Sequence, residues 1–338
     1  MKIKINFKKI KQATLELIKK SEIERNIFLH NLAEILIKNK INIILANKKD
    51  IKKAKENNLS DVFIQRLILN ESGLDKIIDK LYDIQKLKSG LGEIIEERVT
   101  KEKLHLQKIR VPLGVIATIY EARPEVTIDV AALCIKSGNA AILKGGSEAL
   151  CTNKVLYQCV LDSLIKSNFP QESISFIASN NRKIINDILK HNESIDLVIA
   201  RGNYKMVKAI KNQSTIPVLA HSAGGSRIYV DKSANLTMTV NILVNAKVSK
   251  PSACNSLDTI ILHKKIASKF IPVITNSLEK YGVKIVKNDW SKEFLDLKVS
   301  IKIVNGVDEA IKFINKYSKQ HSEGIIAADK KVIKKFTD

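Results

Sequence analysis

Cys254 stands in the stretch "SKPSACNSLDTII", residues 249 to 261, where a proline-led turn meets an apolar, β-branched run. Pro251 and the small residues that follow it predict a tight, exposed backbone. A thiolate at such a place can attack an electrophilic carbon, while backbone N–H groups or the amide of Asn255 hold the resulting oxyanion. A packed core thiol is the alternative interpretation of a single cysteine.

A second stretch with chemical potential is "ILKGGSEA", residues 142 to 149. Lys144 is followed by Gly145 and Gly146, and then by Ser147, which is a residue type that caps helices. Glycines let a ligand approach the backbone closely, and free N–H groups at a helix start attract anions. The stretch predicts a site for a phosphorylated cofactor, although a plain strand-turn-helix connection uses the same residues. A G-x-G-x-x-G fingerprint is absent from the sequence.

The elements that must position these residues alternate between strand and helix. Predicted strands cover 114–120, 139–144, 173–178, 195–200 and 216–220, with helices at 125–138, 181–191 and 203–212 and after Ser147. Such alternation predicts a parallel sheet covered on both faces. Arg201 and Gly202 lie at another strand-turn-helix junction. A second α/β unit follows, and we place the boundary between domains 1–240 and 241–338.

The first 90 residues read as helices, including a capping box formed by Ser21 and Glu24. The segment 104–111 then alternates as a strand does. A chain of 338 residues with 45% apolar content is long enough for two domains. The sequence shows no apolar stretch of membrane-spanning length and no signal peptide, so we expect a cytoplasmic protein with no membrane partner.

The formal net charge is +22, from 57 basic and 35 acidic residues. Nucleic-acid binding is one interpretation of such a charge. The lysines are scattered along the whole chain without an arginine-rich cluster or an aromatic platform, which favours no nucleic-acid partner and a positive field that attracts small anions. The four cysteines show no metal-binding spacing, and no metal site is predicted.

Several segments together resemble the γ-glutamyl phosphate reductase family of the aldehyde dehydrogenase superfamily. They are "VPLGVIATIYEARPEVTIDVAALCIKSGNAAILKGGSEA" (111–149), "STIPVL" (214–219), "GGSRIYVDKSANL" (224–236), "VNAKVSKPSACNSLDTIILH" (244–263) and "HSEGIIAAD" (321–329). The resemblance implies an aldehyde-dehydrogenase-like α/β fold. That fold has two Rossmann-type parallel-sheet domains, a helical N-terminal region and a small oligomerisation hairpin.

The resemblance also implies an activity. It is the NADPH-dependent reduction of L-γ-glutamyl 5-phosphate to L-glutamate 5-semialdehyde and phosphate, a step from glutamate to proline. Cys254 falls on the nucleophile of the family, with Asn255 beside it. Lys144 to Ser147 match the segment that holds the adenosine ribose and its 2′-phosphate, and Arg201 and Gly202 match the turn near the pyrophosphate and nicotinamide.

Ser222 stands where aldehyde-oxidising members of the superfamily carry a glutamate, and the lack of that carboxylate suits a reductase, although a variable loop is the alternative interpretation. Three departures from the family pattern bear on the expected activity. Glu125 replaces the asparagine that supplies an oxyanion amide, and Asn203 follows Gly202 where the family has a second glycine. Family members also continue beyond Asp338 with a segment that completes the sheet and part of the oligomer contact. We therefore expect a homo-oligomer if that segment is present. An inactive remnant of the enzyme and another acylating aldehyde dehydrogenase remain as alternatives.

Overall fold

The computed structural model describes residues 5–179, 181–221, 224–287 and 289–338. The chain divides into two compact units, Met1–Ser222 and Ala223–Asp338. The predicted boundary at residue 240 is wrong, because it falls inside helix α10 (Leu236–Val248). The strand before that helix, β8 (Ser226–Val230), pairs with β9 (Leu257–His263) and so belongs to the second sheet.

The first unit begins with five helices, as the sequence predicts. They are α1 (Phe7–Leu17), α2 (Glu22–Lys38), α3 (Lys40–Glu56), α4 (Asp61–Leu67) and α5 (Glu71–Lys86). The capping box is confirmed, because Ser21 accepts from the Glu24 amide while the Glu24 carboxylate accepts from the Ser21 amide. Leucines and isoleucines on the inner faces of α1, α2, α3 and α5 join the same core as the sheet that follows, while α4 packs in a smaller cluster.

The first sheet is parallel, with the strand order β5-β4-β3-β6-β7. Its strands are β3 (Val115–Tyr120), β4 (Ala140–Gly145), β5 (Ile174–Phe176), β6 (Leu197–Arg201) and β7 (Val218–His221). Between them lie α6 (Glu125–Lys136), the short helix η1 (Ser147–Ala149), α7 (Leu150–Lys166), the short helix η2 (Gln171–Ser173), α8 (Arg182–Lys190) and α9 (Tyr204–Gln213). These strands and helices confirm the alternation read from the sequence.

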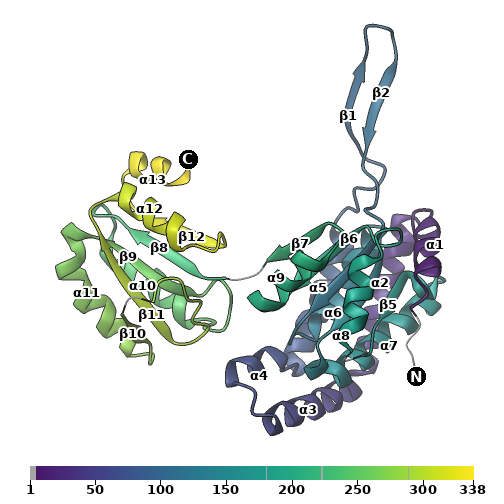
Figure 1. Cartoon of the computed structure of the whole chain (residues 1–338), viewed down its shortest axis with the longest axis horizontal. Helices are drawn as coiled ribbons and strands as arrows, with labels where there is room; N and C mark the ends of the chain where they lie inside the picture. Colours follow the sequence, from purple (N-terminus) through teal and green to yellow (C-terminus); the bar gives the residue numbers. More distant parts are fainter. Residues whose placement is uncertain (1–4, 180, 222–223, 288) are drawn as a thin grey trace. The chain divides into compact units, whose positions relative to one another are not determined.

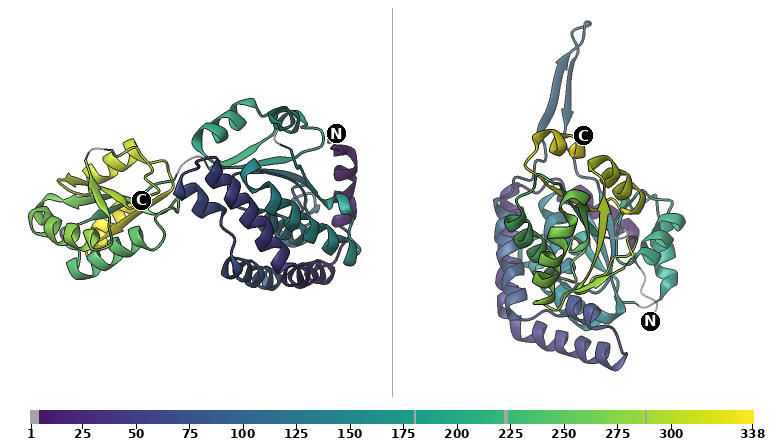
Figure 2. Two further views of the ribbon diagram at one scale, coloured as in Figure 1. Left: turned by 90° about the horizontal axis from the view of Figure 1, so that it is seen from below. Right: turned by 90° about the vertical axis from the view of Figure 1, so that its left-hand side faces the viewer.

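Helices cover both faces of this sheet (Figure 2). The chain moves outward through β3, β4 and β5, and then returns past β3 to form β6 and β7. Right-handed crossovers therefore put α6 and α7 on one face and α9 on the other. The order reverses between β3 and β6. In open α/β sheets, ligands bind at such a point, outside the carboxyl ends of the strands.

A two-stranded antiparallel hairpin, β1 (Ile94–Val99) with β2 (His105–Ile109), extends away from the helices and sheet of its unit (Figure 1). The segment 104–111 was predicted as a strand, and its partner β1 was not. Every residue of both strands is exposed, apolar ones such as Ile95 and Leu106 included. An isolated hairpin is marginally stable at best in water, so this one is a candidate for a further contact.

The second unit has another parallel sheet, in the order β10-β11-β9-β8-β12. Beside β8 and β9 it contains β10 (Lys284–Val286), β11 (Lys298–Val304) and β12 (Ser322–Ile326), with helices α11 (Lys264–Glu279), α12 (Val307–Tyr317) and α13 (Lys330–Thr337). Helices α10 and α11 cover one face over a shared apolar cluster, and α12 covers the other face over a second cluster. Within the described parts of both units, no helix combines the length and apolarity that a membrane crossing requires.

Candidate active site

The predicted cofactor residues of the first unit gather at the carboxyl edge of its sheet. Lys144 and Gly145 end β4, and Arg201 ends β6. Strand β3, which ends at Tyr120, pairs with both, so that Tyr120 lies opposite Gly145 on one side and Arg201 on the other. The fold thus brings two separately predicted junctions to the same edge of the sheet, one on each side of β3, and the junction after β6 lies at the reversal of the strand order.

Lys144 is buried, and its ammonium donates to the carbonyl of Gly145 at 2.7 Å. Burial lowers the pKa of Lys144, while the nearby carboxylate of Glu148 acts in the opposite direction. Glu148 accepts a hydrogen bond from the amide of Ala122 at 2.7 Å and occupies the space that a side chain on Gly146 would fill. A carboxylate therefore lies over Gly146, one of the two glycines that were predicted to receive an anion.

Ser147 does not cap helix α7, contrary to the prediction. It starts the short helix η1, and the residue before α7 is Ala149, whose side chain has no acceptor. Asp50 of α3 fills that role, because its carboxylate accepts from the amides of Cys151 at 3.1 Å and Thr152 at 2.7 Å. The amides of the first turn of α7 thus have a protein partner.

At the junction after β6, a carboxylate again accepts from a backbone amide. Arg201 is exposed, and its carbonyl accepts from the amide of Glu121 at 3.1 Å. The Glu121 carboxylate accepts from the amide and the side chain of Asn203, at 2.9 and 2.8 Å. These bonds fasten the end of β3 to the turn before α9, with Gly202 between the two.

The residues at this edge fit a phosphorylated dinucleotide. Gly145 and Gly146 carry no side chain of their own, Lys144 supplies a cation, and all three lie at the end of β4, the strand next to β3 at the point where the strand order reverses. The Glu148 carboxylate lies at the place over Gly146 and would repel an anion there, so we expect it to turn away when an anion binds.

Glu125 opens helix α6 and lies 3.8 Å from Arg123. A carboxylate in the first turn is favourable beside the positive end of a helix, and that accounts for an acid at this position locally. The structure does not relate it to Cys254, because the two residues belong to different units. Ser222 lies outside the described residues.

Cys254 lies in the second unit, in the turn between α10 and β9. The amide of Ala253 donates to Lys250 and that of Ser256 donates to Ala253, at 2.9 and 3.0 Å, which makes two successive tight turns. Cys254 is partly exposed, and Asn255 beside it is exposed. The nucleophile predicted from the sequence thus has access to a ligand, at the amino edge of the second sheet.

Gly224 and Gly225 lie directly against this turn. The amide of Gly225 donates to the Cys254 carbonyl at 2.8 Å. A Cβ placed on Gly224 would lie 2.7 Å from the Cβ of Cys254, which is closer than real carbon atoms approach. Only glycine at 224 allows the start of β8 to support the Cys254 turn so closely.

The other cysteines fit structural roles. Cys134 and Cys159 are buried, and burial raises the pKa of each thiol to about 12. Cys151 is partly exposed, and burial together with Asp50 also raises the pKa of its thiol. A raised pKa disfavours the reactive thiolate, so these three positions are poor sites for a nucleophile.

Sequence reasoning missed Lys247 and Asp258, two charged residues that flank the Cys254 turn in the structure. Both are buried. A signal for them was present, because each is the single charged residue within an apolar segment, "NILVNAKV" and "LDTIIL". A charge inside an apolar run indicates a buried ion with a partner.

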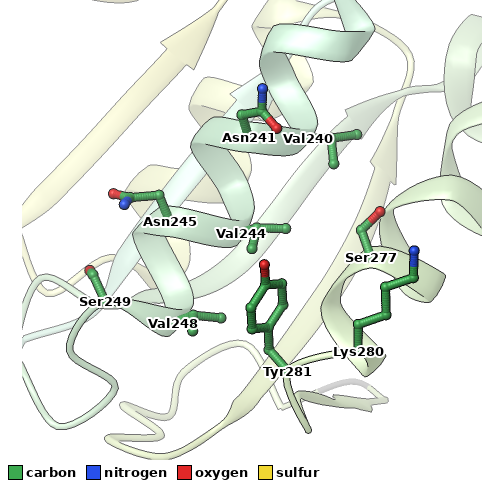
Figure 3. Close-up of a pocket in the computed structure, with 9 residues that line it drawn as sticks. All are labelled: Val240, Asn241, Val244, Asn245, Val248, Ser249, Ser277, Lys280 and Tyr281. Atoms are coloured by element: carbon green, nitrogen blue, oxygen red, sulfur yellow. The ribbon is translucent and has the colours of Figure 1, made fainter.

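A hollow of about 490 Å³ lies between α10 and α11 in the same unit, and Tyr281 and Lys280 face Val244 and Asn241 across it (Figure 3). Its lining contains neither Cys254 nor any other thiol or carboxylate. It is therefore not the candidate active site.

A parallel sheet with glycines and a lysine at its carboxyl edge in one unit, and an accessible cysteine turn in the other, are features that the resemblance to aldehyde dehydrogenases leads us to expect. The sequence model of the aldehyde dehydrogenase family matches residues 2–291. The chain therefore belongs to the aldehyde dehydrogenase family, as the resemblance predicted. Membership in this family implies a nicotinamide cofactor.

Within that family, the relatives of high identity are γ-glutamyl phosphate reductases. The enzyme of Listeria welshimeri is 39% identical over 90% of this chain and 78% of its own length, and that of Clostridium kluyveri is 40% identical over 90% and 77%. The crystal structure of the Thermotoga maritima enzyme superposes with a TM-score of 0.91 at 35% identity, over 98% of this chain and 84% of that one. The predicted fold class is confirmed.

Proposed function

We propose that this protein catalyses the NADPH-dependent reduction of L-γ-glutamyl 5-phosphate to L-glutamate 5-semialdehyde and phosphate, a step from glutamate to proline. The observation that carries the proposal is the Cys254 turn, a partly exposed thiol held by two tight turns and by Gly225. Relatives of about 40% identity that bear the name of this reductase support the choice of substrate.

The chemistry assigned to Cys254 follows from its thiol. The thiolate attacks the carbonyl carbon of the acyl phosphate, a carbon–sulfur bond forms, and the carbon–oxygen bond to phosphate breaks. The product of this half-reaction is a thioester on Cys254, with the electron pair of the broken bond on phosphate. The backbone amide of Cys254 and the side chain of Asn255 are the donors that we assign to the oxyanion.

We assign the cofactor to the edge formed by Lys144, Gly145, Gly146, Ser147 and the Arg201–Gly202 junction. When bound, reduced nicotinamide would supply a hydride to the thioester carbon, and the carbon–sulfur bond would then break to give the aldehyde and the Cys254 thiolate. Lys144 is the cation that we assign to the 2′-phosphate, which is the group that separates NADPH from NADH.

Replacement of the nucleophile tests the proposal. We expect Cys254→Ser to lower turnover by about a thousandfold or more, since a neutral hydroxyl replaces a thiolate. The measurement is phosphate-dependent reduction of NADP⁺ with L-glutamate 5-semialdehyde, which is the reverse reaction. Cys151→Ser is the matched control, and we expect it to keep wild-type turnover. A Cys254→Ser enzyme with undiminished turnover would disprove the assignment.

We also propose that the protein forms a homo-oligomer through the β1–β2 hairpin. The hairpin presents exposed apolar side chains, which include Ile94, Ile95, Val99, Leu104 and Leu106, and it has two unpaired strand edges. A surface of this kind is typical of a contact with another chain. A second copy of this chain is the partner that we assign to it.

A further inference from the structure

A buried pair of opposite charges closes the base of the Cys254 turn. Lys247 is the next-to-last residue of α10, and Asp258 is the second residue of β9. Their side chains are 0% and 2% exposed, with 3.6 Å between the Lys247 Nζ and the Asp258 Oδ1. The pair thus joins the helix that enters the turn to the strand that leaves it.

Two hydrogen bonds connect residues of this pair to their neighbours, and a third holds the Cys254 turn itself. The Ser256 hydroxyl donates to the Lys247 carbonyl at 3.5 Å, and the Phe294 amide donates to the Asp258 Oδ1 at 3.2 Å. Gly225 donates to the Cys254 carbonyl on one side, and a Cβ on that glycine would lie 3.4 Å from the Asp258 Oδ2. Gly225 therefore lies against both the Asp258 carboxylate and the Cys254 carbonyl.

The pair is an unfavourable arrangement for stability. Among the described residues, neither the Lys247 Nζ nor the Asp258 Oδ2 has a hydrogen-bond partner. A buried ion pair recovers only part of the hydration that it loses, and an apolar pair of similar volume is often as stable or more stable. Burial lowers the pKa of Lys247 and raises that of Asp258 to about 6, each against the effect of the other group.

We propose that the Lys247–Asp258 pair positions the Cys254 turn for nucleophilic attack, and that it does so at the expense of fold stability. Its charges attract each other and hold the two ends of the turn at a fixed separation. Both are positioning residues, because they act through the turn and need not contact the substrate. The inference rests on the proposed function, since it takes Cys254 as the nucleophile.

Other charged groups face Asp258 and set the pH at which it titrates. Glu293, from the segment between β10 and β11, opposes its ionisation, while Arg227 of β8 is the second cation beside it. Asp296 acts in turn on Lys247. From β11, Ser300 contributes only a hydroxyl, which donates to the Asp258 carbonyl at 3.2 Å. Protonation of Asp258 below about pH 6 should weaken the pair and lower the reactivity of Cys254 further than loss of thiolate does alone.

The test replaces both charges with apolar side chains in the full chain. The variant is Lys247→Met with Asp258→Leu, and the matched control is Lys335→Met with Asp308→Leu, at an exposed ion pair of the same unit. The rate constant for alkylation of Cys254 by iodoacetamide is measured from pH 5 to 8 by mass spectrometry of its peptide. Thermal unfolding gives the Tm of each protein.

We expect the buried-pair variant to keep or raise its Tm and to react about tenfold more slowly at pH 7.5, because small displacements of a nucleophile lower its rate steeply. Its profile should also lack the additional step near pH 6 that we expect of the wild type. The control should match the wild type in all three readouts. If the double variant does not fold, Asp258→Asn provides a second test, because it removes the charge and keeps the shape of the side chain. We expect the same slower alkylation and the same absence of the step near pH 6.

Two results would overturn the inference. One is an alkylation rate within twofold of the wild type. The other is a Tm lower by about 5 °C or more, which would make the pair an ordinary stabilising contact. Alkylation does not require turnover, so the two proposals can fail separately. Undiminished turnover of Cys254→Ser would refute the proposed function. Unchanged alkylation of Cys254 in the buried-pair variant would refute only the role of the pair.

Discussion

At the scale of single residues, a lysine and a glutamate compete over the same glycines. Lys144 favours an anion at the carboxyl edge of the first sheet, while the carboxylate of Glu148 lies over Gly146 and accepts from Ala122. A carboxylate in that place repels the phosphates of a dinucleotide. The affinity for the cofactor therefore depends on how readily Glu148 turns away.

We expect Glu148→Gln to lower the KM for NADPH by about threefold to tenfold, because the amide removes that repulsion while it keeps the size of the side chain. Steady-state kinetics with NADPH and NADH give the measurement. Lys144→Met should do the opposite and reduce kcat/KM for NADPH more than for NADH. Glu16→Gln, at an exposed ion pair of α1, is the control. An unchanged KM in the Glu148 variant would contradict the competition.

At the scale of elements, the start of β8 and the Cys254 turn fit only through a glycine. We expect Gly224→Ala to displace the turn and to lower kcat about a hundredfold with little change in cofactor binding, since the cofactor residues lie in the other unit. Turnover and the fluorescence of bound NADPH separate the two effects.

Gly306→Ala provides the matched control for that substitution. Its backbone is extended, and a Cβ there meets no atom within 4 Å. We therefore expect wild-type turnover from this variant. A Gly224→Ala enzyme as active as the wild type would show that the close approach of β8 to the Cys254 turn has no part in the reaction.

The hairpin is the other element whose role can be tested. Ile95→Lys with Leu104→Lys places two charges on an exposed apolar surface, so we expect it to dissociate the oligomer without unfolding the unit, because a buried contact no longer forms. Light scattering gives the mass in solution. Leu15→Lys, at an exposed leucine of α1, serves as the control. An unchanged mass for the hairpin variant would count against the proposed contact.

The sequence predicted most of these elements and missed a few. Strands β3 and β4 are buried, mostly apolar runs that start just after Gly114 and Gly138, a pattern that local composition reveals. The capping box of α2 is equally local. Ser147 was misassigned because the acceptor for the amides of α7 comes from Asp50, about a hundred residues earlier, and no local pattern contains such a contact.

At the scale of the whole molecule, the net charge of +22 predicts an effect of salt. A positive field attracts anionic NADPH and is screened by added ions. We expect kcat/KM for NADPH to fall several-fold between 0.05 and 0.5 M NaCl. Alkylation of Cys254 by neutral iodoacetamide should not change over the same range. A kcat/KM independent of salt would mean that the scattered lysines do not assist binding.

The sequence alone determined the family and the strand-turn-helix junctions, and it supplied the proposal that Cys254 is the nucleophile, because each depends on residues that lie close together in the chain. Only the tertiary structure decided how those junctions meet on the two sides of β3, and which side chains occupy them. It also revealed the buried Lys247–Asp258 pair, the contact of Gly224 with Cys254 and the division after residue 222. The reason is physical: parallel strands bring together residues that are distant in sequence, and burial then sets their charges and contacts.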